Sequence, residues 1–338
     1  MPPTHSDSVS VPLWAPKLNQ NPNSLRELPK AEVHVHLEGC FSPSDLAALA
    51  ARHGEPLPRP DEALFDFHGF DDFLEFLSWS CGLLRTVDDV ASAAYAYAVR
   101  AAASGVVVAD IIVNPTHWAS WRGDLAGLIG ALDKGFTEAE TDGLPPVGLC
   151  ISVLRMQTAA EALQLVEDLV ALAHPRVVAL SIDGNEALSG RTGSRFADAF
   201  QLAGRAGLKR TVHAGESSGP EGVRDAIDLL GADRLDHGVR AIEDPALVEE
   251  LVERRIPLDI CPSSNLTLGV FPSWQDHPLD DLRKAGVRVS LNSDDPGFLG
   301  VDLAGEYERS AAAFGWSDDI IRSVAATSLD VCFTNNRR

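Results

Sequence analysis

Two histidines, His34 and His36, are separated by a single residue in the segment VHVHLEG. The alternating apolar residues of this segment predict a β-strand, in which residues two apart point to the same face. Neutral imidazole is a common ligand of Zn²⁺, so two such side chains on one face provide half of a metal site. Histidines also pack inside proteins, and this pair by itself leaves both interpretations open.

Further ionisable side chains stand where other apolar runs end. His213 and Glu216 close the run in TVHAGE, His237 closes the run in LDHG, and the motif NSDDPG places Asp294 beside Asp295. Each of these residues alone is as typical of a structural residue or a turn as of a site. Because all of them follow apolar runs, we expect the fold to gather them. Such a set of histidines and carboxylates is suited to metal binding and to proton transfer.

The elements that must position these residues are short, apolar, β-branched runs that alternate with amphipathic helical stretches. Such alternation predicts a parallel sheet covered by helices. Runs such as VVVADIIV are apolar on both faces, as buried parallel strands are, and we find no GxGxxG or GxxxxGK[ST] turn typical of nucleotide-binding sheets. We therefore predict an α/β fold, a (β/α)8 TIM-type barrel, with its site at the carboxyl ends of the strands. The predicted strands are Glu32–Leu37, Val106–Val113, Val147–Val153, Val177–Ile182, Lys209–Ala214, Leu235–His237, Pro257–Cys261 and Arg288–Asn292.

A long connection, Phe41–Gly105, follows the first predicted strand. Its helical stretches carry aromatic and leucine residues at helical spacing, which indicates packing onto the core. The arrangement that we predict is a helical insertion that forms a lid over the barrel mouth. Residues 1–25, rich in Pro, Ser and Asn, are expected to be a flexible arm, and residues 26–338 a single catalytic barrel domain.

The composition narrows the classes of function. Lys and Arg number 28 against 49 Asp and Glu, which gives a net charge of −21 and disfavours nucleic acid or an anionic membrane surface as partner. No apolar run reaches the ~20 residues of a membrane span, and the first residues lack a secretory signal pattern. Five scattered cysteines without a CxxC pair are typical of a reducing compartment. We expect a cytoplasmic protein that acts on a small molecule, with an oligomeric state that the sequence does not indicate.

In combination, these motifs resemble the adenosine/adenine deaminase family of metal-dependent amidohydrolases. The resemblance extends from LPKAEVHVHLEG near the start of the chain to LNSDDPGFLG near its end, and includes FDDFLEFL, DGNE, TVHAGES, RLDHGVRAIEDP and IPLDICPSSN. Members of this family have a barrel fold and bind one zinc ion. The resemblance implies that one Zn²⁺ per chain is held by His34, His36, His213 and Asp294.

The resemblance also implies roles in the hydrolytic deamination of a 6-aminopurine. Glu216 would donate a proton to N1 of the purine, and His237 would orient and deprotonate the attacking water. Asp295 would contact N7, and the backbone amide of Gly184 would contact N3. These roles agree with the chemistry, because a zinc-activated water can attack C6 only if the ring nitrogen accepts a proton. A carboxylic acid can supply that proton near neutral pH when burial raises its pKa, so we predict a raised pKa for Glu216.

Departures from the family pattern bear on the substrate. Adenosine-specific members commonly have an aspartate that meets the ribose where this chain has Glu38, and adenine-specific relatives tend to have glutamate. Gly184 argues for a nucleoside, since adenine-specific relatives lack that glycine. Asn185 stands where the family has the aspartate of GDE, which removes a charge. We predict a zinc-dependent deaminase of adenosine or an adenosine derivative, with free adenine as the alternative.

Three further alternatives concern the substrate, the metal count and the class of protein. The chain could act on a modified nucleoside such as aminodeoxyfutalosine, or could be a catalytically inactive nucleoside-binding barrel, against which the intact set of ligands and proton-transfer residues argues. A two-metal site is disfavoured because VVALSIDG offers no lysine for a bridging carboxylate. The remaining histidines, among them His277, are expected in surface or structural roles.

Overall fold

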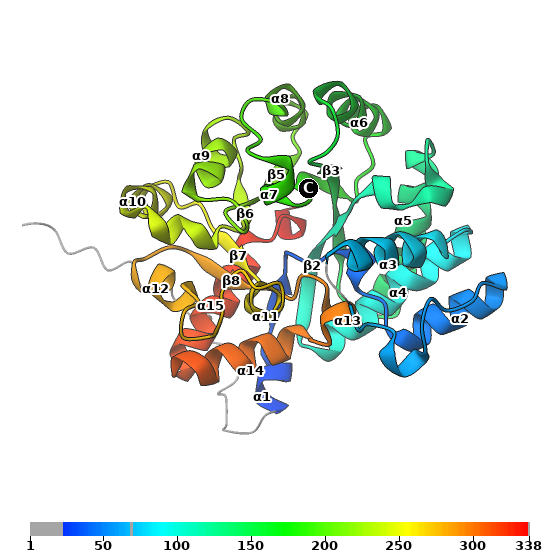
Figure 1. The fold of residues 1–338 in the computed structure, drawn as a ribbon, viewed down its shortest axis with the longest axis horizontal. Coiled ribbons are helices and arrows are strands. Elements are labelled where there is room, and N and C mark those ends of the chain that lie inside the picture. The colour runs from blue at the N-terminus through cyan, green and yellow to red at the C-terminus, as the bar shows by residue number, and fades with distance from the viewer. Residues whose placement is uncertain (1–22, 68–69, 337–338) are drawn as a thin grey trace, which may run out of the picture.

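A computed structural model describes residues 23–67 and 70–336 of the chain. Within these residues, eight parallel strands form one sheet whose spatial order follows the sequence, and helices surround it (Figure 1). Val35 forms a parallel bridge with Asp294, so the last strand meets the chain that follows the first and the sheet nearly closes. The predicted (β/α)8 barrel is therefore confirmed. The strands are β1 (Lys30–Glu32), β2 (Val106–Val113), β3 (Val147–Leu154), β4 (Val177–Asp183), β5 (Lys209–Ala214), β6 (Arg234–His237), β7 (Leu258–Ile260) and β8 (Val289–Leu291).

The helices between strands begin where the sequence supplies capping groups. Thr158 accepts a hydrogen bond from the Glu161 amide in a capping box. Asp244 precedes Pro245, the first residue of its helix, and accepts hydrogen bonds from the amides of Ala246 and Leu247. None of the helices in the described ranges is long and apolar enough to cross a membrane. Their bounds are α1 (Asn23–Glu27), α2 (Pro43–His53), α3 (Phe70–Gly82), α4 (Val87–Ala103), α5 (Leu125–Thr141), α6 (Ala159–Leu172), α7 (Glu186–Ser189), α8 (Ala197–Arg205), α9 (Pro220–Asp228), α10 (Pro245–Glu253), α11 (Pro262–Thr267), α12 (Leu279–Lys284), α13 (Pro296–Leu299), α14 (Leu303–Phe314) and α15 (Asp318–Val331).

The first strand is the one that differs most from its prediction. A continuous strand over 32–37 was expected, but β1 ends at Glu32, and the chain then makes only isolated bridges at Val35 and His36. The reason is a side chain: Asn292 Oδ1 accepts from the amides of Val33 at 2.8 Å and His34 at 3.1 Å, in place of regular strand pairing. The two histidines therefore lie in irregular chain that the end of β8 holds in place.

The connection after β1 packs on the barrel through aromatic side chains. Phe65, Phe67 and Phe76 contact one another, with ring centroids 5.3–6.4 Å apart. Each also lies against Phe298 of α13, with ring centroids 5.2–6.1 Å apart. Helix α3 also contacts the 3₁₀ turn Leu37–Gly39 and the chain after β2. The expected core packing is thus observed, and a lid function for these helices stays a prediction.

The predicted flexible arm falls largely outside the described residues. Residues 1–22 are not described, and residues 23–25, which we placed in the arm, form the start of α1. The organisation of 26–338 as one catalytic domain stays a prediction.

A buried ion-pair network lies at the centre of the barrel, beneath the strand ends. The Arg234 guanidinium donates to Asp110 at 2.6 Å and to the Val33 carbonyl at 2.7 Å, and its Nε lies 2.9 Å from Asp259. The C-terminal segment joins this network, because Asp110 accepts from the amide of Phe333 at 2.7 Å. Breaking a buried pair leaves an uncompensated charge, so the network fixes the position of Asp259.

Replacing Lys30 with methionine is expected to make the stability of the fold less dependent on pH. Burial lowers the pKa of Lys30 to about 7, and Glu32 only partly offsets this. Between about pH 7 and the ~10.4 of an unfolded lysine, the unfolded chain binds more protons, so the free energy of unfolding rises with pH, by at most about 1.4 kcal/mol per unit. Urea unfolding of both proteins in that window measures the two slopes. Equal slopes would contradict the assignment.

Candidate active site

Four donor atoms from three separate parts of the barrel converge at its mouth. His213 Nε2 lies 3.1 Å from His34 Nε2 and 3.0 Å from His36 Nε2. Asp294 Oδ1 lies 3.2 Å from His34 Nε2 and 3.5 Å from His36 Nε2. Ligand atoms of a tetrahedral site with bonds of ~2.0–2.1 Å are about 3.3–3.4 Å apart, so these separations match the edges of such a site.

The hydrogen-bond partners of the rings fit a cation between them. His34 donates its Nδ1–H to the Asp259 carbonyl at 2.9 Å, which leaves a lone pair on Nε2. His213 Nδ1 lies 3.2 Å from Asp236 Oδ2, which favours a proton on Nδ1 and a lone pair on Nε2 there as well. Two lone pairs that face each other at 3.1 Å repel unless a positive ion lies between them. The donor set, imidazoles with a carboxylate, suits Zn²⁺.

His237 lies beside these four donors. Its Nε2 is 3.5 Å from Glu216 Oε1 and 4.0 Å from Asp294 Oδ2. Both His237 and Asp294 have positive φ, 67° and 62°, a conformation in which His and Asp are enriched among non-glycine residues. These turns direct the two side chains into the mouth. His237 also has a nitrogen close enough to serve as a metal ligand. One donor atom from each of His34, His213, His237 and Asp294 lies within 4.8 Å of the others, and such a group could hold a metal ion.

Glu216 is held in place by a second glutamate. Glu186 accepts hydrogen bonds from the backbone amides of Glu216 at 2.9 Å and of Ser217 and Ser218, each at 3.2 Å. Burial, followed by the charge of Asp294, raises the pKa of Glu216 to about 7, as the sequence led us to expect, although 18% of its side chain is exposed. Glu216 Oε1 has no hydrogen-bond partner among the described residues and is free to contact a ligand.

Glu38 is buried, and only one of its carboxylate oxygens is engaged. Its Oε1 accepts from Trp118 Nε1 and from the Asn114 amide, both at 2.7 Å, whereas Oε2 has no hydrogen-bond partner in the described chain. Burial raises the pKa of Glu38 to about 7, and the N–H groups of Trp118, of Glu38 itself and of Asn114 act in the opposite direction. Asn114 also donates to Asp183 at 2.6 Å, and Asp183 lies 3.9 Å from His36. Glu38 is thereby connected to the candidate metal ligand His36.

The last two predicted contacts, Asp295 and Gly184, lie in the chain that follows β8 and β4. The Asp295 carboxylate packs against Gly39, where a Cβ would meet Asp295 Oδ1 at 1.9 Å, so only glycine fits. Gly184 directly follows β4 and has φ +99°, a conformation that other residues rarely adopt. The backbone therefore explains the glycine at 184, and its presence no longer argues for a nucleoside.

Three residues that the sequence did not single out complete the surroundings. Ser264 donates to Asp294 Oδ2 at 2.6 Å, Asn265 Nδ2 lies 3.3 Å from His237 Nδ1, and His277 Nε2 lies 3.1 Å from Asn265 Oδ1. Ser264 and Asn265 belong to the CPSSN motif, whose position directly after a predicted strand was the available signal. His277 is buried and not at the surface.

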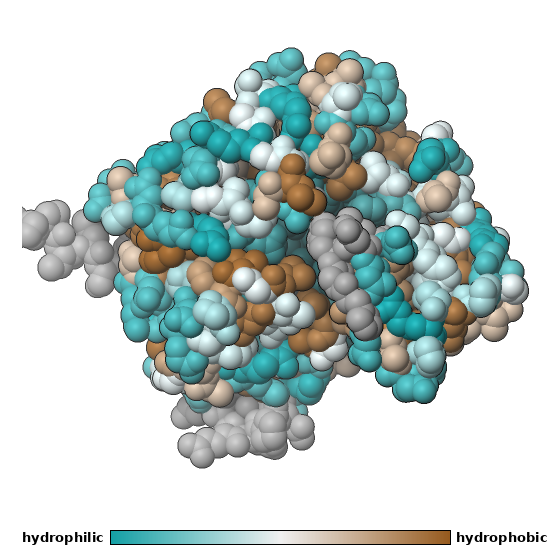
Figure 2. Space-filling view, viewed as in Figure 1, coloured by the Kyte–Doolittle hydropathy of each residue, from teal (hydrophilic) through white to brown (hydrophobic). Residues whose placement is uncertain are grey.

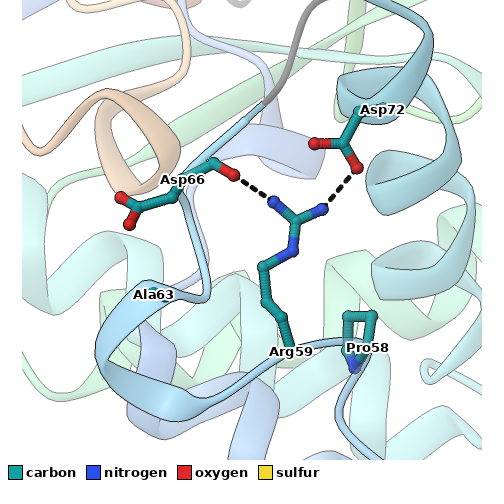
Figure 3. A pocket seen from close by; sticks show the side chains of 5 residues that line it. All are labelled: Pro58, Arg59, Ala63, Asp66 and Asp72. Carbon is teal, nitrogen blue, oxygen red and sulfur yellow. Dashed lines mark hydrogen bonds and ion pairs between the residues drawn. The ribbon is translucent and has the colours of Figure 1, made fainter.

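A separate hollow lies in the insertion after β1. It has a volume of about 420 Å³, and Arg59 spans it by donating to the Asp66 carbonyl and, at 2.5 Å, to Asp72 Oδ1 (Figure 3). None of the strand-end residues lines it.

In Figure 2, apolar residues gather near the middle of the face viewed. Exposed apolar side chains include Met156, in the loop after β3, and Leu188 of α7. We assign the chemistry to the barrel mouth because its ionisable groups converge there.

Comparison with known proteins shows which family this chain resembles. A family model described as adenosine deaminase matches residues 29–338. The chain is 35% identical over 323 residues to an adenine deaminase of Rhodospirillum rubrum, which covers 94% of this chain and 96% of that protein. Among solved structures, an adenine deaminase from Arthrobacter aurescens superposes with a TM-score of 0.85 at 32% identity, covering 90% of this chain and 94% of that one. An amidohydrolase from Burkhoderia ambifaria with bound Zn gives a TM-score of 0.85 at 28% identity, covering 96% and 91%.

Proposed function

We propose that free adenine is the substrate of this chain. The chain belongs to the adenosine deaminase family and is a metal-dependent hydrolase acting on C–N bonds, and the proposal proceeds from that membership. The reaction would replace the 6-amino group with oxygen and release ammonia. The sequence led us to expect adenosine or a derivative, with free adenine as the alternative. We now favour the alternative, because the relatives at 33–36% identity are named adenine deaminases and because Gly184 has a backbone explanation.

The metal site that we propose comprises the four donors predicted from the sequence. The near-tetrahedral separations and the facing lone pairs support one zinc ion per chain. When bound, such an ion supplies the Lewis acidity that lowers the pKa of a water ligand to ≈ 7. We choose His36 over His237 as the fourth ligand because His36 Nε2 lies within 3.5 Å of both His213 and Asp294, whereas the His237 contact with Asp294 is 4.0 Å.

The remaining residues would act on the substrate. Glu216, whose pKa near 7 keeps a protonated form available at neutral pH, would donate to N1. His237, whose Nε2 lies 3.5 Å from Glu216 Oε1 and 4.0 Å from Asp294 Oδ2, would orient the attacking water. Asp295 would contact N7, and the Gly184 amide would contact N3. Each of these groups lies at the end of a strand or in the loop that follows it, where barrel enzymes place their chemistry.

The observation that carries the choice of free base is the unpaired oxygen of Glu38. Oε1 is already held by Trp118 and Asn114, so Oε2 needs a donor from the ligand to avoid remaining buried and unsatisfied. Free adenine offers an N–H on its five-membered ring, and the sugar of a nucleoside replaces that hydrogen. A buried glutamate also extends one methylene further than aspartate into the space that a ribose would need.

We expect kcat/KM for adenine to exceed that for adenosine by at least about 100-fold, which a panel of adenine, adenosine and substituted adenosines would measure through ammonia release. In Glu38→Gln, an amide N–H would face the ring N–H, and adenine turnover should fall by about 10–100-fold in kcat/KM, as for loss of a charged hydrogen bond. Glu253, an exposed residue at the end of α10, provides the control for glutamate-to-glutamine substitution. Higher kcat/KM for adenosine than for adenine in the wild type would overturn the proposal.

A further inference from the structure

A chain of hydrogen bonds leads from the start of α12 to His237. The Leu279 amide lies 3.2 Å from His277 Nδ1, His277 Nε2 lies 3.1 Å from Asn265 Oδ1, and Asn265 Nδ2 lies 3.3 Å from His237 Nδ1. His277, Asn265 and His237 are all buried. Because none of these groups can exchange partners with solvent, the direction of each hydrogen bond depends on the next.

The backbone amide sets that direction for the whole chain. An amide N–H can only donate, so His277 Nδ1 accepts, and a neutral His277 must carry its proton on Nε2. That proton is donated to Asn265 Oδ1, which turns the Asn265 amide so that Nδ2 donates to His237 Nδ1. A flipped Asn265 would leave His277 accepting at both nitrogens, which a neutral imidazole cannot do. Burial lowers the pKa of His277 to about 4, which keeps it neutral.

We propose that Asn265 and His277 are positioning residues that hold His237 in the tautomer with its proton on Nε2. His237 then presents a hydrogen-bond donor to the space between Glu216 and Asp294, where its Nε2 is 3.5 Å and 4.0 Å from their carboxylate oxygens. A neutral imidazole in this tautomer has no lone pair on Nε2 to take a proton from the attacking water, so that proton would pass to the Asp294 carboxylate, whose Oδ2 lies 4.0 Å from His237 Nε2. This inference rests on the proposed deamination, and it revises the expected role of His237 from base to donor.

Asn265→Asp reverses the polarity of the chain. An aspartate at 265 can only accept, so it still receives the His277 proton but now requires a proton on His237 Nδ1, which leaves Nε2 as an acceptor. We expect kcat to fall by about 10²–10³-fold with KM within a few-fold, as for loss of a preorganised donor. If His237 acts as a base at Nε2, the same variant keeps or gains activity, which would overturn the proposal.

Substitutions at His277 separate positioning from packing. His277→Gln places an N–H near the former Nε2 and should keep kcat within a few-fold, whereas His277→Leu leaves Asn265 free to flip and should lower kcat. His174 is a control, because it also accepts from the amide two residues later at 3.2 Å. It precedes β4, whereas the site residue Gly184 follows that strand, and it takes no part in the hydrogen bonds that lead to His237. His174→Leu should retain wild-type kcat. Equal losses in both His277 variants would indicate packing alone and contradict the proposal.

The tautomer itself can be observed without turnover. Nitrogen-15 NMR of histidine-labelled protein distinguishes a protonated Nε2 from a protonated Nδ1, and the His237 signal is identified by its absence in His237→Gln. We expect a protonated Nε2 in the wild type and a protonated Nδ1 in Asn265→Asp. A protonated Nδ1 in the wild type would overturn this inference and leave the proposed function standing. Failure to release ammonia from adenine would refute the proposed function, while the NMR result still decides the tautomer.

Discussion

Replacing Glu216 with glutamine is expected to lower kcat for adenine by about 10²–10⁴-fold, the usual contribution of a general acid, while KM stays within a few-fold. Glutamine keeps the size of the side chain and its hydrogen-bonding capacity but has no proton that it can release to N1. The turn that carries Glu216 should persist, because Glu186 holds it through backbone amides and not through the Glu216 side chain. Steady-state ammonia release and binding of a non-hydrolysable purine together separate loss of chemistry from loss of binding.

The control for this substitution is Glu221→Gln, an exposed glutamate in the first turn of α9 that lies beyond the same loop. Its kcat and KM should both equal those of the wild type. Metal content should be unchanged in both variants, since neither residue is a proposed ligand. A Glu216→Gln enzyme with kcat within a few-fold of wild type would remove this residue from the proton transfer.

The barrel could be predicted because its strands are buried on both faces and are therefore continuous apolar runs. Each of the predicted runs after the first overlaps an observed strand, and the residues singled out at their ends meet at the mouth. The first strand was predicted too long because the Asn292 side chain replaces strand pairing at Val33 and His34. No local pattern encodes such a replacement, since the two partners are more than 250 residues apart.

The supporting residues were harder to predict for the same reason. Glu186 was visible only as part of a family motif, yet its carboxylate collects the amides of the turn that carries Glu216. His277 acts through Asn265, twelve residues away, and reaches a histidine that lies a further 28 residues back in the chain. Sequence periodicity shows which residues are buried but not which buried polar atoms pair. The positive φ of His237 and Asp294 is likewise set by tertiary contacts and has no sequence signal beyond the tolerance of these residue types.

Removing His213 should abolish stable metal binding, which is the second large effect that the geometry predicts. His213 contacts both His34 and His36 through Nε2, so His213→Ala takes away the donor shared by two edges of the site. Asp236→Asn provides a graded comparison. It leaves all four donors and alters only the carboxylate 3.2 Å from His213 Nδ1, and loss of such an outer partner typically costs about 10–100-fold in metal affinity.

We therefore expect the dissociation constant for zinc to rise by about 10–100-fold in Asp236→Asn and by more than about 100-fold in His213→Ala. Chelator competition measures these constants without reference to turnover, and elemental analysis gives the metal content per chain. Because a ligand that binds only the folded state stabilises it, added zinc should raise the Tm of the wild type and leave that of His213→Ala unchanged. If His213→Ala retained a full equivalent of zinc with unaltered affinity, the ion would have to be held by a set of donors that excludes His213. The positions proposed for the acid, the water-orienting histidine and the purine depend on the proposed ligand set, so they would no longer follow.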